Sequence, residues 1–405
     1  MTPARLFPII KSSNYQITTL DLSYILNQLG EEREHYFNAV SPPIIQTSNF
    51  AFKEVASLRD ALNDESKTYL YSRGNNPTIE ILEQKLAALD GAEAALVFAS
   101  GVAAVTIPVV ANLKSGDHIV CVAKPYSWTN KLFNDLLPRF GVTCTMIDGT
   151  RIENFEKAIQ QNTRLIFLES PNTFTYELQD LKAIASLAKS KKILTMIDNS
   201  YCTPLSQKPI EMGVDLSMQT MTKYIGGHSD AVGGVVSGSK EMIDKIFAAD
   251  YLNIGASVSP FNAFLFLRGL RTLELRVKRS CESAAKLVEH FENHSKVLKM
   301  YYPFSKSFPQ RELALKQMKL GGGMFTMALD VQRAEQIERF CNSLDRFLMA
   351  VSWGGHESLA FPVCATIPKE NFNRENIDHK LVRFYIGLED PGVLIEDIEK
   401  ALIKI

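Results

Sequence analysis

The amino-acid sequence predicts an α/β protein with a mostly parallel, seven-stranded sheet, a smaller C-terminal α+β domain and an N-terminal arm. Short apolar runs alternate with helical patterns between residues 94 and 239, as in strand–helix–strand units. A long helical pattern, followed by mixed strand and helix patterns, occupies the chain from residue 259 onward. The first 63 residues show too little apolar periodicity to supply a core of their own.

Composition and charge are those of an ordinary globular enzyme. The chain has 405 residues, of which 46% are hydrophobic and 22% charged, and its formal net charge is -1. That charge favours neither nucleic acid nor an acidic membrane as a partner, and no apolar run reaches the roughly 18 residues of a membrane span. Residues 1–14 lack the long apolar region of a signal or transit peptide, so we expect a cytoplasmic protein.

The cysteines and histidines indicate neither a disulfide framework nor a metal site. None of the six cysteines lies in a CxxC pair, and the seven histidines include no HExxH motif. Scattered cysteines fit a reducing compartment and are expected to be small buried apolar residues.

Residues 1–63 are expected to form the arm. Residues 21–29 could form one short amphipathic helix, and Ser41-Pro42-Pro43 begins an extended segment over residues 44–52. A segment without its own core needs another surface to pack on, either on the same subunit or on a neighbouring one.

The large domain is expected over residues 64–258. Its first helix would follow the turn Asn75-Asn76-Pro77, with Thr78 as its cap and Gly91 at its end. Helical patterns then separate most of seven apolar runs, which are ALVFA, HIVCVA, TCTMID, RLIFLES, ILTMID, VDLSMQ and GGVVSG. This alternation predicts a mostly parallel sheet with helices on both faces. No GxGxxG or GxxxxGKS motif follows a run, which argues against a dinucleotide fingerprint and a P-loop.

The C-terminal domain is expected over residues 259–405. Small residues and turn formers at 253–260 place the boundary, and residues 261–291 are expected to form a single long helix. The remainder mixes strand patterns at 324–330 and 382–388 with helical patterns at 334–344 and 394–405.

Lys223 is the candidate catalytic residue. It follows the run VDLSMQ, and ligands of parallel α/β sheets collect at the carboxyl ends of strands. An ammonium group loses solvation there, which favours the amine, a nucleophile for carbonyl groups and for pyridoxal phosphate. The alternative is an ordinary solvated side chain, because the chain carries 44 lysines and arginines.

Other strand ends supply the remaining parts of a site for pyridoxal 5′-phosphate (PLP), which would form an aldimine with Lys223. Asp198 ends a buried run, where its carboxylate needs a cation such as a protonated pyridine nitrogen. Tyr126 could lay its ring on the cofactor. Helix N-terminal amides, hydroxyls and an arginine would bind the phosphate, from Ser100, Gly101, Val102, Thr220, Thr222, Tyr71 and Arg73. Each part also has a plain structural explanation, such as a helix cap for Asp198.

Six motifs carry a resemblance to a known family. They are YSRGNNPT at 71–78, ASGVAAV at 99–105, IDNSYCTP at 197–204, TKYIGGHSDAVGG at 222–234, SWGGHESL at 352–359 and VRFYIGLED at 382–390. Through them, residues 40–400 resemble the transsulfuration (Cys/Met-metabolism) family of fold-type I PLP enzymes. The resemblance implies an aspartate-aminotransferase-like PLP domain and a homotetramer of dimers with shared active sites, which agrees with the arm.

The resemblance also implies a role for each matching residue. Lys223 is similar to the Schiff-base lysine, Asp198 to the partner of the pyridine nitrogen, and Tyr126 to the stacking tyrosine that also moves protons. Arg383 is similar to the arginine that binds the substrate carboxylate, with Ser352 beside it. The phosphate cup would consist of Gly101, Val102, Thr220 and Thr222, with Tyr71 and Arg73 from a neighbouring subunit, Tyr71 also reaching the substrate.

Several positions depart from the family's usual wording. The family's usual Tyr-Gly-Gly-Thr is here Tyr-Ser-Trp-Thr at 126–129, and the bulky Trp128 should narrow the site. Thr173 replaces an asparagine that often contacts the ring hydroxyl, a contact that Asn172 could take over. Tyr385 stands where a serine usually lies.

We therefore expect a PLP-dependent C–S lyase that acts on a sulfur amino acid by β-elimination, giving thiol, pyruvate and ammonia from L-cystathionine or cysteine conjugates. Val351 occupies a position that is acidic in several γ-acting members, and Trp353 makes the motif SWGG most similar to bacterial cystathionine β-lyases.

Two sets of alternatives remain open. Within the family they are γ-elimination by a cystathionine or methionine γ-lyase, and γ-replacement on O-acyl-homoserine by a cystathionine γ-synthase or O-acetylhomoserine sulfhydrylase, because one methylene separates the substrates. From another class, the chain could be a binding protein that kept the fold without catalysis. The intact Lys223, Asp198, Tyr126 and Arg383 argue against that.

Overall fold

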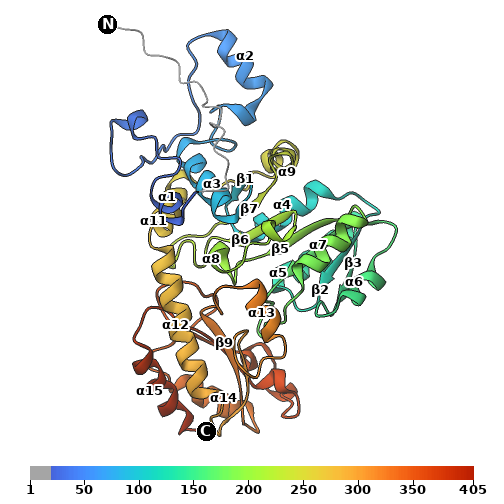
Figure 1. The fold of residues 1–405 in the computed structure, drawn as a ribbon, viewed down its shortest axis with the longest axis vertical. Coiled ribbons are helices and arrows are strands. Elements are labelled where there is room, and N and C mark those ends of the chain that lie inside the picture. Colours follow the sequence, from blue (N-terminus) through green and yellow to red (C-terminus); the bar gives the residue numbers. More distant parts are fainter. Residues whose placement is uncertain (1–19) are drawn as a thin grey trace.

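The computed structural model describes residues 20–405, and the predicted α/β fold with a seven-stranded sheet is confirmed (Figure 1). The strand order is β1-β7-β6-β5-β4-β2-β3. Neighbouring strands from β6 to β3 are parallel, whereas β7 is antiparallel to both β1 and β6. The strands are β1 (Ala94–Phe98), β2 (His118–Val122), β3 (Thr143–Ile147), β4 (Thr163–Glu169), β5 (Leu194–Asp198), β6 (Leu216–Thr220) and β7 (Gly234–Gly238).

Helices cover both faces of this sheet, as the alternating runs predict. On β2, Ile119 belongs to a core with residues of α4 and α9, whereas its neighbour Val120 belongs to a core with residues of α6 and α7. Adjacent strand residues point to opposite faces, so apolar residues at both positions require helices on both sides. The helices of this part are α3 (Pro77–Asp90), α4 (Gly101–Asn112), α5 (Ser127–Lys131), α6 (Ile152–Ala158), α7 (Leu181–Ser190), α8 (Thr203–Ser206), α9 (Lys240–Ile246) and α10 (Leu252–Ile254).

A second, five-stranded sheet with the order β10-β11-β12-β9-β8 forms the C-terminal part. Its strands are β8 (Val297–Tyr301), β9 (Met324–Leu329), β10 (Leu348–Met349), β11 (Leu359–Pro362) and β12 (Leu381–Tyr385). A separate apolar core joins this sheet to α12 (Leu273–Phe291), α14 (Ala334–Asn342) and α15 (Pro391–Leu402). The other two helices of this part, α11 (Pro260–Leu270) and α13 (Arg311–Gln317), contribute buried apolar residues to a different core, which includes residues of α3.

The single long helix expected over residues 261–291 is wrong, because the chain breaks between α11 and α12. Arg276 explains the break. Its Nη2 donates to the Gly269 carbonyl at 2.7 Å, so this carbonyl accepts from a side chain where a continuous helix would have it accept from the backbone. Its Nη1 donates to the Tyr224 carbonyl at 2.8 Å. The guanidinium therefore fixes the helix junction to the turn that follows Lys223.

Thr78 was expected to cap α3, but Asn76 does so by accepting a hydrogen bond from the Thr78 N–H at 3.0 Å. The Thr78 hydroxyl instead donates to the Pro43 carbonyl and accepts from the Ile45 N–H, both at 2.9 Å. It thereby joins the extended N-terminal segment to α3. Gly91 ends the helix in the left-handed conformation, as predicted.

The helical pattern over residues 130–140 forms an irregular helical segment. A π-helical turn over Leu132–Leu136 and a 3-10 turn over Leu137–Phe140 follow α5. Pro138 has no N–H to continue a regular helix, which accounts for the change of pitch.

The described part of the arm contains α1 (Leu22–Asn27) and α2 (Val55–Asn63), and Figure 1 shows α2 standing away from the large sheet. Glu31 fixes the segment after α1 to the body, because Lys85 lies 3.1 Å and Arg271 2.9 Å from its carboxylate. Phe37 is 101% exposed and Val40 81%. The boundaries at residues 63/64 and 258/259 stay predictions. The expected absence of a targeting peptide falls on residues 1–19, outside the described residues.

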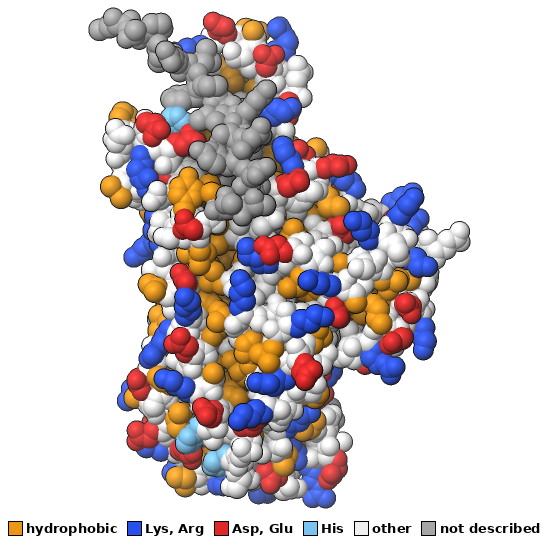
Figure 2. All heavy atoms as spheres, in the orientation of Figure 1, with side chains coloured by type: hydrophobic (Ala, Val, Ile, Leu, Met, Phe, Trp, Pro, Cys, Tyr) orange, Lys and Arg blue, Asp and Glu red, His pale blue; other side chains and the backbone are white. Residues whose placement is uncertain are grey.

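Over residues 20–405, no helix combines the length and apolar character that crossing a membrane would require, and no cluster of three or more His, Cys, Asp or Glu side chains could hold a metal ion. All six cysteines are free, and all except Cys144 are buried. Positive and negative side chains are interspersed on the face drawn in Figure 2, in line with the small net charge.

Asp90, the last residue of α3, makes stability depend on pH. Its fully buried carboxyl accepts hydrogen bonds from the Gln219 amide at 3.0 and 3.1 Å, and burial raises its pKa from 3.8 to about 7. Between those pH values the folded state binds a proton that the unfolded state does not, so this group's contribution to stability falls as pH rises.

Replacing Asp90 with Asn should remove this dependence. We expect the difference in thermal midpoint between Asp90→Asn and wild type to shift in favour of the variant as the pH rises from 5 to 8. The corresponding change in the free energy of unfolding is roughly 2–4 kcal/mol at most. The exposed Asp60→Asn is the control. An Asp90→Asn difference that stays constant over this range would contradict the assignment.

Candidate active site

Lys223 lies in the turn after β6 and faces a loop from the C-terminal sheet. Its Nζ donates to the Ser352 hydroxyl and lies 5.4 Å from the centre of the Trp353 ring. The lysine's pKa is lowered from 10.5 to about 8, first by burial and then by the charge of Arg383, while Asp198 opposes both effects. About a tenth of this amine is therefore unprotonated at pH 7, far more than for an ordinary lysine.

Ser352 joins Lys223 to Arg383. Its hydroxyl accepts from the lysine, while its carbonyl accepts from Arg383 Nη2 at 3.0 Å. Ser352 has a φ of +80°, which is uncommon for a residue other than glycine and typical of functional sites. Gly354, with φ +90°, packs so closely that a Cβ there would lie 2.7 Å from the Lys223 carbonyl carbon. This loop therefore closes directly on the lysine.

Arg383 on β12 has no carboxylate partner. Among residues 20–405, its only hydrogen bond is the one to Ser352, and it forms no ion pair. Burial lowers its pKa, which is the cost of holding an uncompensated guanidinium away from water. A carboxylate from a ligand would supply the missing charge and accept from the free N–H groups.

Asp198 ends β5 at the same edge of the sheet. Its Oδ1 accepts from the Ser200 N–H at 2.9 Å, and burial raises the pKa of its carboxyl although part of the side chain still reaches solvent. Its carboxylate form would be stabilised by a cationic N–H donor in the site.

Glu169 is a site residue to which the sequence alone assigned no role. It ends β4 directly beside Asp198 in the parallel register and accepts hydrogen bonds from the Tyr126 N–H and the Thr173 hydroxyl, both at 2.7 Å. Burial, and then the charge of Asp198, raise its pKa. The signal in the sequence was its position at the end of the run RLIFLES, one strand away from Asp198.

Tyr126 lies close to both carboxylates, and its side chain is 43% exposed. Burial of the remainder, followed by the charges of Asp198 and Glu169, raises the pKa of the phenol. The ring is thus held at the site by the hydrogen bond of its own backbone N–H to Glu169 and keeps its proton at neutral pH.

The N-terminus of α4 forms a narrow cradle against β6. Ser100 caps the helix by accepting from the Ala103 N–H at 3.1 Å. A Cβ on Gly101 would lie only 1.7 Å from Thr220 Oγ1, so only glycine fits between the helix and the strand end. The free N–H groups of Gly101 and Val102 begin the helix and suit a phosphate.

The structure does not bring every expected residue into this cradle. The Thr222 hydroxyl is bonded to the backbone of Gly233, donating at 3.3 Å and accepting at 3.1 Å. Arg73 lies over the Tyr71 ring at 5.1 Å, and within residues 20–405 neither side chain forms a hydrogen bond or ion pair. Their role as contributions to a neighbouring subunit stays a prediction.

The structure shows what surrounds Asn172 and two of the positions that depart from the family's usual sequence, Tyr385 and Trp128. Asn172 donates to the Ala123 carbonyl at 3.2 Å and accepts from the Glu177 N–H at 3.1 Å, so its amide is already occupied by backbone groups. The buried Tyr385 donates to the Gly355 carbonyl at 2.7 Å and so supports the loop that carries Ser352. Trp128 is half exposed, with the ammonium of Lys131 4.9 Å from its ring centre.

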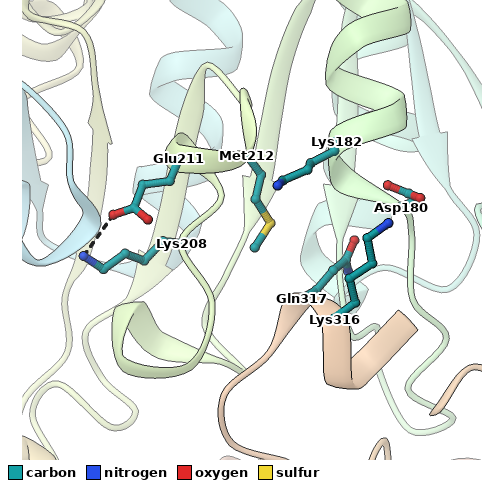
Figure 3. A pocket seen from close by; sticks show the side chains of 7 residues that line it. All are labelled: Asp180, Lys182, Lys208, Glu211, Met212, Lys316 and Gln317. Atoms are coloured by element: carbon teal, nitrogen blue, oxygen red, sulfur yellow. Dashed lines mark ion pairs between the residues drawn. The ribbon is translucent and has the colours of Figure 1, made fainter. Parts of the chain in front are cut away.

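A cavity of about 160 Å³ lies elsewhere, where α7 meets α13 (Figure 3). Its lining includes three lysines and two carboxylates, and Lys208 pairs with Glu211 at 3.1 Å. None of the lining residues belongs to the Lys223 site, so this cavity has no part in the chemistry described here.

Comparison with known proteins places the chain in a family. The family model described as Cys/Met metabolism PLP-dependent enzyme matches residues 25–403. The chain belongs to this family. The resemblance inferred from the six motifs is thereby confirmed, and the protein is a PLP-dependent enzyme of the transsulfuration family.

Individual relatives cover nearly the whole chain. L-Methionine gamma-lyase of Pseudomonas deceptionensis is 36% identical over 398 residues, which are 97% of this chain and 98% of the relative. Cystathionine gamma-synthase 1, chloroplastic, of Arabidopsis thaliana is 35% identical over 370 residues, 90% of this chain and 65% of that protein. The solved structure of cystathionine gamma synthase from Xanthomonas oryzae pv. oryzae in complex with aminoacrylate and cysteine matches with a TM-score of 0.87 at 31% identity, covering 95% of this chain and 98% of that one.

The residues around Lys223 fit PLP, the cofactor of the family. Asp198 is a carboxyl with a raised pKa for which a pyridinium N–H would be a partner. The Gly101 cradle offers helix N–H groups without a side chain in the way. Lys223 supplies an amine of lowered pKa.

Gly101 allows a test of the cradle. Gly101→Ala should weaken PLP binding by roughly tenfold or more, because the new Cβ displaces Thr220 or the start of α4. Titration of the apoprotein with PLP, followed by cofactor absorbance, measures this. Val102→Ala keeps the backbone N–H and is the matched control. If both variants bind PLP like wild type, this cradle is not the phosphate site.

Proposed function

We propose that the protein eliminates the sulfur substituent of an L-amino acid, with Lys223 as the covalent attachment point of PLP and the catalytic base. The supporting observation is the lysine amine. Its pKa is about 8, it donates a hydrogen bond to the Ser352 hydroxyl, and the nearby charge of Asp198 acts on it. When bound, PLP withdraws electrons from the substrate α-carbon and makes its proton acidic.

The chain's own residues would divide the remaining work. Arg383 binds the α-carboxylate and so fixes the substrate's orientation. Lys223, once free, removes the α-proton and holds it on Nζ. Tyr126, whose raised pKa keeps it protonated, can donate a proton to the departing sulfur. Asp198 would pair with the positive charge of the cofactor's ring nitrogen. Glu169, its neighbour on β4, holds the backbone of Tyr126 by a hydrogen bond.

We place γ-elimination first and β-elimination second. The relatives with γ-lyase and γ-synthase names, which match 90% or more of this chain, support γ chemistry; γ-elimination gives thiol, 2-oxobutyrate and ammonia after addition of water. β-Elimination, which the sequence led us to expect from the motif around Trp353, would give pyruvate instead. Val351 is 72% exposed and contributes no acidic group in either case. γ-Replacement on an O-acyl-homoserine is the alternative γ reaction. We also propose that the protein is cytoplasmic.

Products distinguish these reactions. The purified PLP-loaded protein should release thiol and 2-oxobutyrate from L-methionine or L-cystathionine, measured by a thiol reagent and by chromatography of keto acids. Lys223→Ala should lower the rate by at least about a hundredfold, because the base is lost. Lys208→Ala, which removes a partly buried, ion-paired lysine away from this site, is the control. Pyruvate with homocysteine from cystathionine would select β-elimination, and the absence of any keto acid with either substrate would refute the lyase proposal.

We further propose that Tyr71 and Arg73 complete the phosphate site of a second copy of this chain. Both side chains lie on an exposed turn and have no hydrogen-bond or ion-pair partner within residues 20–405. The exposed apolar residues of α2 and of residues 37–40 provide further surface for a neighbouring subunit.

Mixing two inactive variants tests this sharing. Arg73→Ala and Lys223→Ala chains, unfolded or dissociated together and reassembled, should regain up to about a quarter of wild-type activity, because half of the dimers then contain one intact site. Each variant reassembled alone is the control. If the mixture stays as inactive as its parents while Arg73→Ala alone is impaired, the arginine acts within its own subunit.

A further inference from the structure

Arg383 rests on a pair of phenylalanine rings. Its guanidinium carbon is 5.4 Å from the centre of Phe174 and 5.3 Å from the centre of Phe361. The two ring centres are 5.9 Å apart, with an interplanar angle of 31°. Rings on opposite faces of the guanidinium would be separated by about the sum of the first two distances. Both rings therefore lie on the same side of the cation.

The two rings come from different parts of the fold. Phe361 on β11 is the direct cross-strand partner of Arg383 on β12, so their side chains lie on the same face of the C-terminal sheet. Phe174 comes from the loop after β4 of the large sheet and has a φ of +65°. This conformation is a genuine outlier for a bulky residue and persists only where surrounding contacts enforce it.

The contacts that enforce it surround Arg383 itself. Tyr176, two residues after Phe174, is fully buried, has a φ of +58°, and shares a hydrogen bond of 3.1 Å with the Thr326 hydroxyl. Thr326 on β9 is the partner of Arg383 on the opposite side from Phe361. The loop is thus fixed to the strand beside Arg383, and Phe174 is directed to the arginine.

We propose that Phe174 and Phe361 form an aromatic shelf that positions Arg383 for the substrate's α-carboxylate and thereby sets the preference for substrates with a free carboxylate. The proposal rests on the function proposed for Arg383 above. The ring faces attract the cation, and they exclude water from one side of it. The N–H groups lie in the plane of the guanidinium. The Ser352 carbonyl fixes one of them, on Nη2, and a carboxylate can accept from two of the others, which have no partner within residues 20–405.

Binding of an unreactive ligand pair tests the shelf. L-Norvaline carries a carboxylate and no leaving group, and L-norvalinamide lacks only the carboxylate. Their dissociation constants would be measured on the PLP-loaded protein by the change in cofactor absorbance. Phe174→Leu and Phe361→Leu keep an apolar side chain but remove the ring face. Each should raise the L-norvaline constant about three- to tenfold and leave that of the amide within about twofold.

Three comparisons make the result decisive. Phe174→Tyr and Phe361→Tyr keep the ring face and should bind L-norvaline like wild type. Phe372→Leu, a ring in the same domain that lies near His379, should change neither constant. Arg383→Leu should abolish the preference for L-norvaline over its amide.

The outcomes separate the shelf from the reaction. If the Leu variants weaken both ligands equally, or neither, while Arg383→Leu removes the preference, the shelf is overturned and the arginine's role stands. If Arg383→Leu leaves the preference unchanged, the carboxylate site lies elsewhere and the shelf falls with it. If the wild-type protein releases no thiol from any sulfur amino acid but the Leu variants weaken L-norvaline selectively, the lyase proposal fails and the shelf is supported.

Discussion

The site depends on one electrostatic arrangement, in which Lys223 and Arg383 share a partly desolvated space with the carboxylate of Asp198. Burial and the neighbouring guanidinium both lower the lysine's pKa, and Asp198 limits the shift, so that the amine titrates near pH 8 rather than near 10.5. Ser352 links the two cations through its hydroxyl and its carbonyl. The group that must lose a proton and the group that must keep its charge are therefore held by one residue.

The topology of the large sheet explains where these groups meet. β4, β5 and β6 are parallel neighbours, so their carboxyl ends bring Glu169, Asp198 and Thr220 to one edge. The antiparallel β12 of the second sheet faces that edge with Arg383. In the proposed function, the reaction and the binding of the carboxylate thus belong to different sheets, and the loop that carries Phe174 is a direct contact between the two sheets.

Local patterns predicted the fold well, because each apolar run and each strand end is a property of a few consecutive residues. Lys223 and Asp198 could be selected for that reason, although their roles remain predictions. The misses depend on contacts between distant segments. The helix break at 271–272 follows from Arg276 binding the Tyr224 carbonyl, and Thr78 is diverted from capping by the segment at Pro43. Glu169 can be recognised as a site residue only once the structure places it beside Asp198 on the adjacent strand.

Two residues that differ from the family's usual sequence contact the residues around Lys223 or the loop that carries Ser352. Thr173 donates to Glu169, and Tyr385 donates to the carbonyl of Gly355. Trp353, a point of similarity to β-lyases, also lies at this site, since its ring packs edge-on against Tyr224 at 5.4 Å and lies equally far from the Lys223 amine. Its contact is with the lysine, and the role proposed for that lysine, removal of the α-proton, is common to β- and γ-elimination. Similarity in this motif therefore reports how the base is held, and it carries little information on which carbon loses the sulfur.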